Sequence, residues 1–123
     1  MNKVLDRLPA LVDEEYKAAM EQHQPFHSLH EGYAVLLEEV EEAGEELNLV
    51  RSAMPCVWSA ARYDNAGKAI KWADVIESHA VQLAAEAIQV AAMARKLRSG
   101  QTIESALEAA QRPAEQPTGG LAE

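Results

Sequence analysis

The sequence of 123 residues contains one cysteine, Cys56, so an intramolecular disulfide is impossible. A single thiol is typical of proteins from a reducing compartment, and we expect a cytoplasmic protein. Aromatic residues make up only 5% of the chain, and no apolar run approaches the length of a membrane-spanning helix. The first eleven residues include Lys3, Asp6 and Arg7 without a long apolar core, so we expect no secretory signal there.

Basic residues are scarce as well, with 11 against 20 acidic ones and a formal net charge of -9. This balance argues against a general affinity for nucleic acid or for an anionic membrane surface. It does not exclude an anionic ligand, because a metal ion can bridge an acidic protein and an acidic substrate. The low aromatic content and the abundance of Ala, Glu, Leu and Gln predict an all-α protein.

Apolar residues recur at helical spacing along most of the chain. We expect one helical domain over residues 1–111, an antiparallel bundle completed by oligomerisation, and a disordered tail over 112–123. The third helix is apolar nearly all round from Val81 onward, which favours its burial against a second subunit. The predicted helices cover residues 2–22, 29–53, 68–97 and 102–111.

Local signals set the predicted helix ends. Ser28 and Glu31 have the form of a capping box, which would begin the second helix at Leu29, and Pro55 would follow its end. Pro9 leaves two starting points open for the first helix, Asn2 or Pro9 itself. A turn is expected over residues 63–67, and Ser99-Gly100 would end the third helix.

The second helix carries six glutamates in nine positions, from Glu38 to Glu46. At about 100° per residue, Glu39, Glu42 and Glu46 line one flank of its apolar stripe, whereas Glu38 points away from it. Neighbouring like charges repel by a few tenths of a kcal/mol per pair, so a divalent cation is the natural counter-charge. Gly44 interrupts the run, and its missing side chain would permit a close approach of another helix.

Glu86 stands among apolar residues of the third helix. A buried carboxylate is costly unless it is paired or bound to a metal. Antiparallel packing of the second and third helices would bring Glu39, Glu42 and Glu86 to one place. Three carboxylates suit Mg²⁺ or Mn²⁺, which prefer oxygen ligands.

The pattern Glu39-x-x-Glu42 followed by Glu86-x-x-Gln89 resembles the E-x-x-E … E-x-x-D signature of the MazG-like, all-α nucleoside triphosphate pyrophosphohydrolases. Residues 27–39 and 86–94 are similar to a subgroup found in phages and bacteria. The resemblance covers roughly residues 27–97. It implies cleavage of an NTP or dNTP between the α and β phosphates, giving a monophosphate and pyrophosphate. It further implies Mg²⁺ or Mn²⁺, and dimers or tetramers built from four-helix bundles.

By position, the resemblance makes Glu39, Glu42 and Glu86 metal ligands and places Gln89 where the family usually has aspartate. An amide oxygen can bind Mg²⁺ or orient a water, but it brings no charge and cannot act as a base. Either three carboxylates hold the metal, with Glu38 or Glu46 assisting, or activity is weakened or lost; the intact remainder of the pattern favours the first. The resemblance also implies a purine deoxynucleotide such as dGTP and a bacterial or phage-infected cell.

The expected mechanism is an in-line attack of water on a phosphorus, assisted by the metal, with Glu38, Glu39 or Glu42 accepting the proton. Four further residues are candidates for substrate binding: His30 at the site mouth, Lys68 and Lys71 for the phosphates, and Trp72 for the base. Each has a plainer explanation as well: solubilising surface charge for Lys68 and Lys71, packing in an interface for Trp72, and simple exposure for His30.

A second class of function competes with the enzyme. The protein would be a non-catalytic, acidic helical-bundle interaction protein, whose glutamates form a solvated helix face and whose Ala-rich third helix forms a dimer seam. Glu86 would then pair with Lys68, Lys71 or Arg95 across the interface. Gln89 is the residue that favours this alternative.

Overall fold

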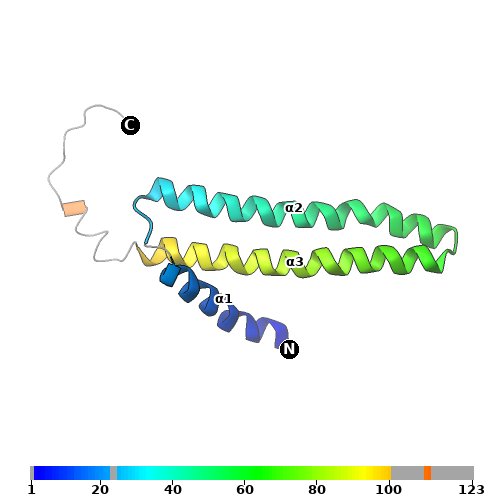
Figure 1. Cartoon of the computed structure of the whole chain (residues 1–123), viewed down its shortest axis with the longest axis horizontal. Coiled ribbons are helices and arrows are strands. Elements are labelled where there is room, and N and C mark those ends of the chain that lie inside the picture. The colour runs from blue at the N-terminus through cyan, green and yellow to red at the C-terminus, as the bar shows by residue number, and fades with distance from the viewer. Residues whose placement is uncertain (1, 23–24, 101–109, 112–123) are drawn as a thin grey trace, which may run out of the picture.

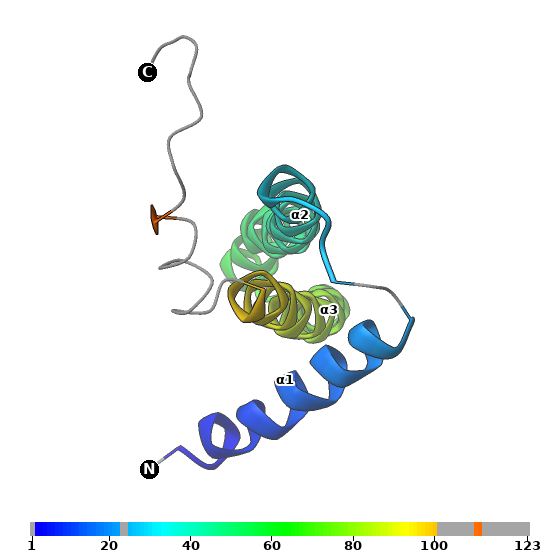
Figure 2. The same ribbon diagram turned by 90° about the vertical axis from the view of Figure 1, so that its left-hand side faces the viewer.

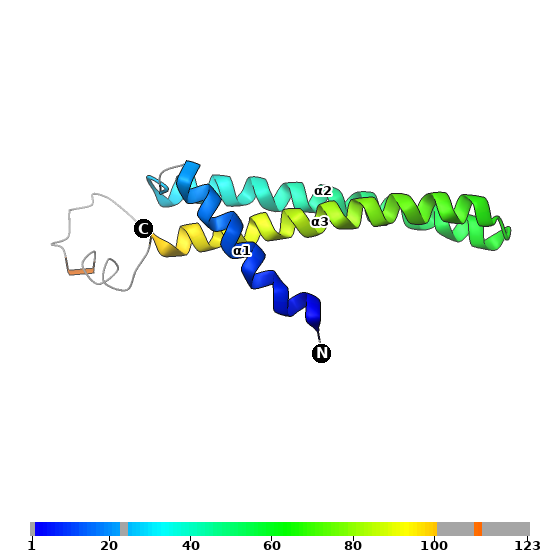
Figure 3. The ribbon, with the colours of Figure 1, turned by 60° about the horizontal axis from the view of Figure 1, so that its bottom comes forward.

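The structure, a computed structural model, describes residues 2–22, 25–100 and 110–111. It contains three long helices, α1 (Lys3–Gln22), α2 (Leu29–Arg62) and α3 (Ala66–Ser99), and no strand within those residues. The all-α prediction is confirmed. Helices α2 and α3 lie side by side as an antiparallel hairpin, and α1 crosses α3 obliquely near its C-terminal end (Figures 1 and 3). The end-on view in Figure 2 shows α1 against α3 and away from α2.

The predicted end of the second helix was wrong. Helix α2 runs through Pro55 and ends at Arg62, nine residues beyond the predicted end at residue 53. Proline removes one backbone hydrogen bond, but Ala53 and Ala60, on either side of it, are each only 2% exposed. Their packing in the hairpin offsets the lost bond, so tertiary contact overrides the local signal.

Helix α1 begins at Lys3 and contains Pro9, so the alternative start at Pro9 was wrong. The side chain of Asn2 accepts a hydrogen bond from the Leu5 N–H (3.1 Å), which satisfies one of the free donors of the first turn. Pro9 is the seventh residue of the helix, so it removes one intrahelical N–H···O=C bond, that to the Leu5 carbonyl, without ending the helix. The starting point at Asn2 was therefore the better prediction.

The predicted N-cap of α2 at Ser28 is confirmed, and the predicted capping box is present in part. Ser28 accepts a hydrogen bond from the Glu31 N–H (3.1 Å), while the Glu31 carboxylate accepts from the N–H of His27 instead of from that of Ser28. In the turn, Asp64 adopts a φ of 52°, and Asn65 caps α3 by accepting from Lys68 N–H. Helix α3 ends at the predicted Ser99-Gly100 signal, but it begins at Ala66, two residues before the predicted start and inside the turn expected over 63–67, because the Asn65 side chain caps it. The predicted helix over 102–111, apart from residues 110–111, and the tail over 112–123 lie outside the described residues.

The core of the hairpin is narrow, and small residues form most of it. The buried apolar side chains are those of Ala53, Ala60, Ala92 and Met93. The close approach expected at Gly44 occurs at Gly32 instead, where a Cβ would lie 2.6 Å from Leu97 Cδ1. Nothing lies within 4 Å of a Cβ built on Gly44. None of the helices in the described ranges has the length and apolar composition that crossing a bilayer needs.

Candidate metal and nucleotide site

Three carboxylates meet in the middle of the hairpin. Glu39 and Glu42 extend from neighbouring turns of α2, and Glu86 comes from the facing part of α3. Each offers a carboxylate oxygen, and these oxygens lie within 4.8 Å of one another. The expected convergence of these residues is confirmed; their role as metal ligands remains a prediction, because acidic groups also gather on proteins without binding an ion. We call them the carboxylate cluster.

Two carboxyl groups of the carboxylate cluster, those of Glu39 and Glu42, have a raised pKa. Burial raises the pKa of the half-buried Glu39 carboxyl, and the charges of Glu86 and Glu38 raise it further. The pKa of the exposed Glu42 is raised chiefly by the charge of Glu39, then by partial burial and by Glu86. Both shifts mean that the folded protein favours positive charge at this point, whether a proton or a cation.

Two other glutamates of the same run lie outside the carboxylate cluster. Glu46 faces α3, as its predicted flank requires, but its carboxylate lies 2.8 Å from Nδ1 of His79. Glu38 is exposed and is not a member of the cluster, but its charge contributes to the raised pKa of Glu39 and Glu42. The helical angles therefore placed Glu39, Glu42 and Glu46 correctly on one flank of α2. The register of α2 against α3 decided which of them meet Glu86.

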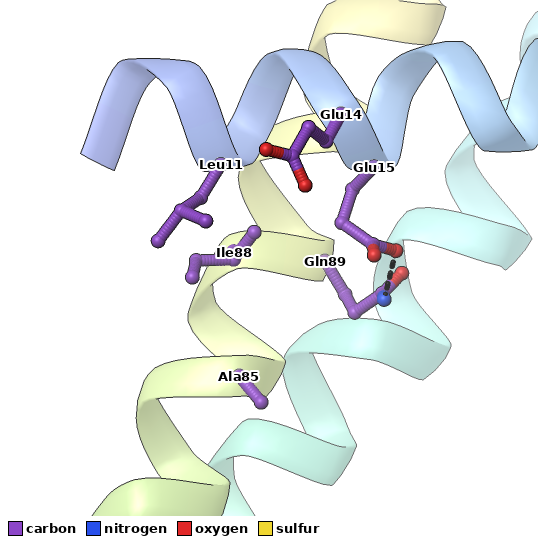
Figure 4. Close-up of a pocket in the computed structure, with 6 residues that line it drawn as sticks. All are labelled: Leu11, Glu14, Glu15, Ala85, Ile88 and Gln89. Atoms are coloured by element: carbon purple, nitrogen blue, oxygen red, sulfur yellow. Dashed lines mark hydrogen bonds between the residues drawn. The ribbon is translucent and has the colours of Figure 1, made fainter. Parts of the chain in front are cut away.

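Gln89 is held by a residue of α1. Its side-chain amide donates a hydrogen bond to the carboxylate of Glu15 (Figure 4). The amide nitrogen is thereby occupied, and its carbonyl oxygen is left to accept. Helix α1 thus brings a carboxylate beside the position where the family pattern has aspartate. Sequence reasoning missed Glu15, because nothing in the spacing of α1 shows which face of α3 it will cover.

A cavity of about 440 Å³ adjoins the carboxylate cluster, where all three helices meet. Lys96 lines it and is only 6% exposed, with its Nζ 4.5 Å from the centre of the Phe26 ring. Lys96 was also missed, although it lies seven residues after Gln89 and therefore on the same face of α3. The lining includes Glu15, Gln22, Glu39, Gln89, Met93 and Lys96.

The other predicted substrate-binding residues do not reach the carboxylate cluster within one chain. Lys71 is exposed near the start of α3, 15 residues before Glu86, which is roughly 22 Å along a helix. Its ammonium lies 5.5 Å from the ring of the half-buried Trp72. Lys68 lies still farther away, and His30 is exposed in the first turn of α2. Their assignment to the substrate stays a prediction that a neighbouring copy of the chain would have to fulfil.

The ion pairs expected for Glu86 under the alternative function do not form within the chain. Arg95 donates to Asp13 of α1 (3.1 Å). Lys17, together with Arg95, holds the pKa of the Asp13 carboxyl below its usual value. No ion pair within the described residues includes Glu86.

Comparison of the chain with family models, with curated proteins and with solved structures gives no match. The likeness to the MazG-like enzymes therefore rests on the sequence patterns at residues 27–42 and 86–94 alone.

Proposed function

We propose that the protein is a metal-dependent nucleotide pyrophosphohydrolase that converts a (d)NTP to the monophosphate and pyrophosphate. The observation that carries the proposal is the carboxylate cluster, in which Glu39, Glu42 and Glu86 converge from two helices with raised pKa values for Glu39 and Glu42. All-oxygen donors fit Mg²⁺ or Mn²⁺, and a cation would offset the repulsion among the three. The adjoining cavity is within the size range of small-molecule sites.

In this proposal the residues have three roles: holding the ion, orienting its bound water and accepting a proton. Glu39, Glu42 and Glu86 would hold the ion, which supplies charge neutralisation at the phosphates and a lowered pKa for a bound water. Gln89, fixed by Glu15, would present its carbonyl oxygen to that water or to the ion. A carboxylate of α2 that the ion does not occupy, Glu38 or one oxygen of Glu42, would accept the proton of the attacking water.

We further propose that the protein works as a homodimer, because one face of the hairpin is uncovered. The residues of α2 that face α3 recur every seven positions: Gly32, Glu39, Glu46 and Ala53. Each is followed by an exposed apolar residue: Tyr33, Val40, Leu47 and Met54. On α3 the residues after Trp72, His79, Glu86 and Met93 are Ala73, Ala80, Ala87 and Ala94, all exposed. In an antiparallel hairpin these two rows turn to the same side, which we call the open face. Helix α1 packs on the opposite side, against Ala85 and Ile88.

The charges of α2 favour an antiparallel pairing of the two copies. Seven glutamates lie between residues 31 and 46, whereas residues 47–62 carry Arg51 and Arg62 and no acid. Antiparallel α2 helices would set the acidic half of one copy against the basic half of the other. Gly44 and Arg51, four residues after Val40 and Leu47, lie on the same side of α2. With the two copies crossing between residues 45 and 46, Gly44 would meet Leu47 of the second copy, and Val40 would meet its Arg51.

A pyrophosphate-release assay over a panel of NTPs and dNTPs, with Mg²⁺ and with Mn²⁺, tests the proposal. We expect release with at least one deoxynucleotide, the family resemblance pointing to dGTP, and complete loss with EDTA. Absence of release with every nucleotide would instead support the non-catalytic interaction protein, which the open face would also suit.

A further inference from the structure

A lysine of α3, Lys96, is nearly buried, and no carboxylate of the described residues lies within ion-pair distance of its ammonium. The Glu31 carboxyl is the acidic group on which its charge acts: the pKa of Glu31 is lowered chiefly by its hydrogen bond from the His27 N–H and to a smaller extent by Lys96. Lys96 is 6% exposed, and the ion pairs and side-chain hydrogen bonds of residues 2–22 and 25–100 do not include its ammonium. The face of the Phe26 ring, 4.5 Å from Nζ, offers partial compensation. An ammonium in such a place is costly unless water or an anion completes its surroundings.

Lys96 shares its cavity with the carboxylate cluster. Glu39 belongs to the cluster and also lines the cavity of about 440 Å³, whose other charged residues are Glu15 and Lys96. Lys96 follows Glu86 by ten residues, roughly 15 Å along α3. Its ammonium lies beside the Phe26 ring, and Lys96 also lines a second cavity with Phe26 and Glu31, so it stands between the two cavities. The cavity thus has carboxylates at one end and a single cationic side chain at the other.

We propose that Lys96 binds the phosphate groups of a polyphosphate whose other end is held at the carboxylate cluster through a divalent cation. The inference rests on the proposed function for the cation at the cluster. Glu15 and Glu39 would repel a phosphate in the absence of that cation, so the anion binds only as its metal complex. Lys96 then supplies the positive charge for the phosphates. Lys68 and Lys71, near the start of α3, do not reach the cluster within one chain.

Isothermal titration with pyrophosphate, at saturating Mg²⁺, measures this contact without turnover. The variant Lys96→Met keeps the length and apolar stem of the side chain and removes its charge, and Lys96→Arg restores the charge. Lys3→Met is the matched control, because Lys3 is exposed in the first turn of α1. We expect Lys96→Met to weaken pyrophosphate binding at least tenfold, Lys3→Met to leave it unchanged, and Lys96→Arg to retain most of it. Binding of Mn²⁺ alone should be the same in all four proteins.

The outcomes separate this inference from the proposed function. Equal pyrophosphate affinity in the wild type and Lys96→Met would overturn the role of Lys96 and leave the hydrolase untouched. Wild-type protein that binds no pyrophosphate at all would overturn it too, and the release assay would then decide the hydrolase separately. Binding that depends on Lys96, together with no hydrolysis of any nucleotide, would support the inference and contradict the proposed function.

Discussion

The two halves of the hairpin are built differently. In the half nearer to α1, which we call the polar half, the interface between α2 and α3 contains Glu39, Glu46, His79 and Glu86. In the other half this interface is apolar, with Ala53 and Ala60 almost fully buried. Small apolar residues are therefore sufficient to hold these two helices together. The carboxylates of the polar half repel one another, and the packing of the two helices does not require them. Such a locally unfavourable arrangement is typical of a functional site.

The largest expected effect is the loss of hydrolysis when the polar half loses a carboxylate. Glu86→Ala or Glu39→Ala should lower the rate of pyrophosphate release at least 100-fold, since even changes to residues behind metal ligands commonly cost about 10–100-fold. Circular dichroism should show unchanged helical content. Glu45→Ala, on the exposed side of α2, is the control and should keep full activity. Full activity in Glu86→Ala would remove the carboxylate cluster from the mechanism.

Metal binding should stabilise the polar half in a pH-dependent way. The raised pKa values of Glu39 and Glu42 stabilise the metal-free fold below about pH 4.5, and this contribution is lost as the pH rises through the folded-state values. At neutral pH, Mg²⁺ or Mn²⁺ at 100 times its Kd should add about 2.7 kcal/mol. Thermal unfolding should show a metal-induced rise in Tm at pH 7.5 that shrinks toward pH 5, because protons compete with the ion. A Tm that is the same with and without Mg²⁺ or Mn²⁺ would contradict the metal site.

The third prediction concerns the open face. Gly44 has nothing within 4 Å of a built Cβ, so Gly44→Leu is harmless in a monomer and should even favour the helix. In the proposed dimer the same change crowds Leu47 of the second copy, at a cost of about 1–3 kcal/mol. Analytical ultracentrifugation should show a dimer that dissociates at least about fivefold more readily. Gln82→Leu, exposed on α3 outside the open face, is the control. A higher Tm with unchanged mass in Gly44→Leu would exclude this interface.

A smaller effect is expected where α1 meets the polar half. Gln89→Asp restores the aspartate of the family pattern, but it removes the donor to Glu15 and sets two carboxylates together. We expect a loss of about 1–3 kcal/mol in the free energy of unfolding, measured by urea denaturation. The double variant Glu15→Gln with Gln89→Asp exchanges donor and acceptor and should recover most of it. No recovery in the double variant would show that the pair does not act as one hydrogen-bonded unit.

The smallest effect should come from the pair that ends the polar half. His79 lies 2.8 Å from Glu46, and both side chains remain partly exposed. His79→Ala should reduce the free energy of unfolding by at most about 1 kcal/mol and leave pyrophosphate release unchanged. A large loss of activity would place this pair within the site, contrary to the division drawn between the two halves.

Local patterns in the sequence were sufficient for the helices and for part of the candidate site. Helical spacing and the caps at Ser28 and Gly100 follow from interactions within a few residues, so they could be predicted. The angular positions of Glu39 and Glu42 follow from the helix repeat in the same way. Pro55 was misjudged because its effect depends on burial in the hairpin, which no local signal contains.

Only the tertiary structure decided which side chains share the site. The register of α2 against α3 brings Glu86 to Glu39 and Glu42, and ties Glu46 to His79 instead. The crossing of α1 over α3 brings Glu15 to Gln89 and encloses the cavity that Lys96 lines. Sequence by itself determined an acidic helical chain with a glutamate row at helical spacing. Contacts between helices depend on packing angles and register. The meeting of Glu39, Glu42 and Glu86 could be expected only by assuming antiparallel packing, whereas the contacts of Glu15 with Gln89 and of Glu46 with His79 could not be predicted from any stretch alone.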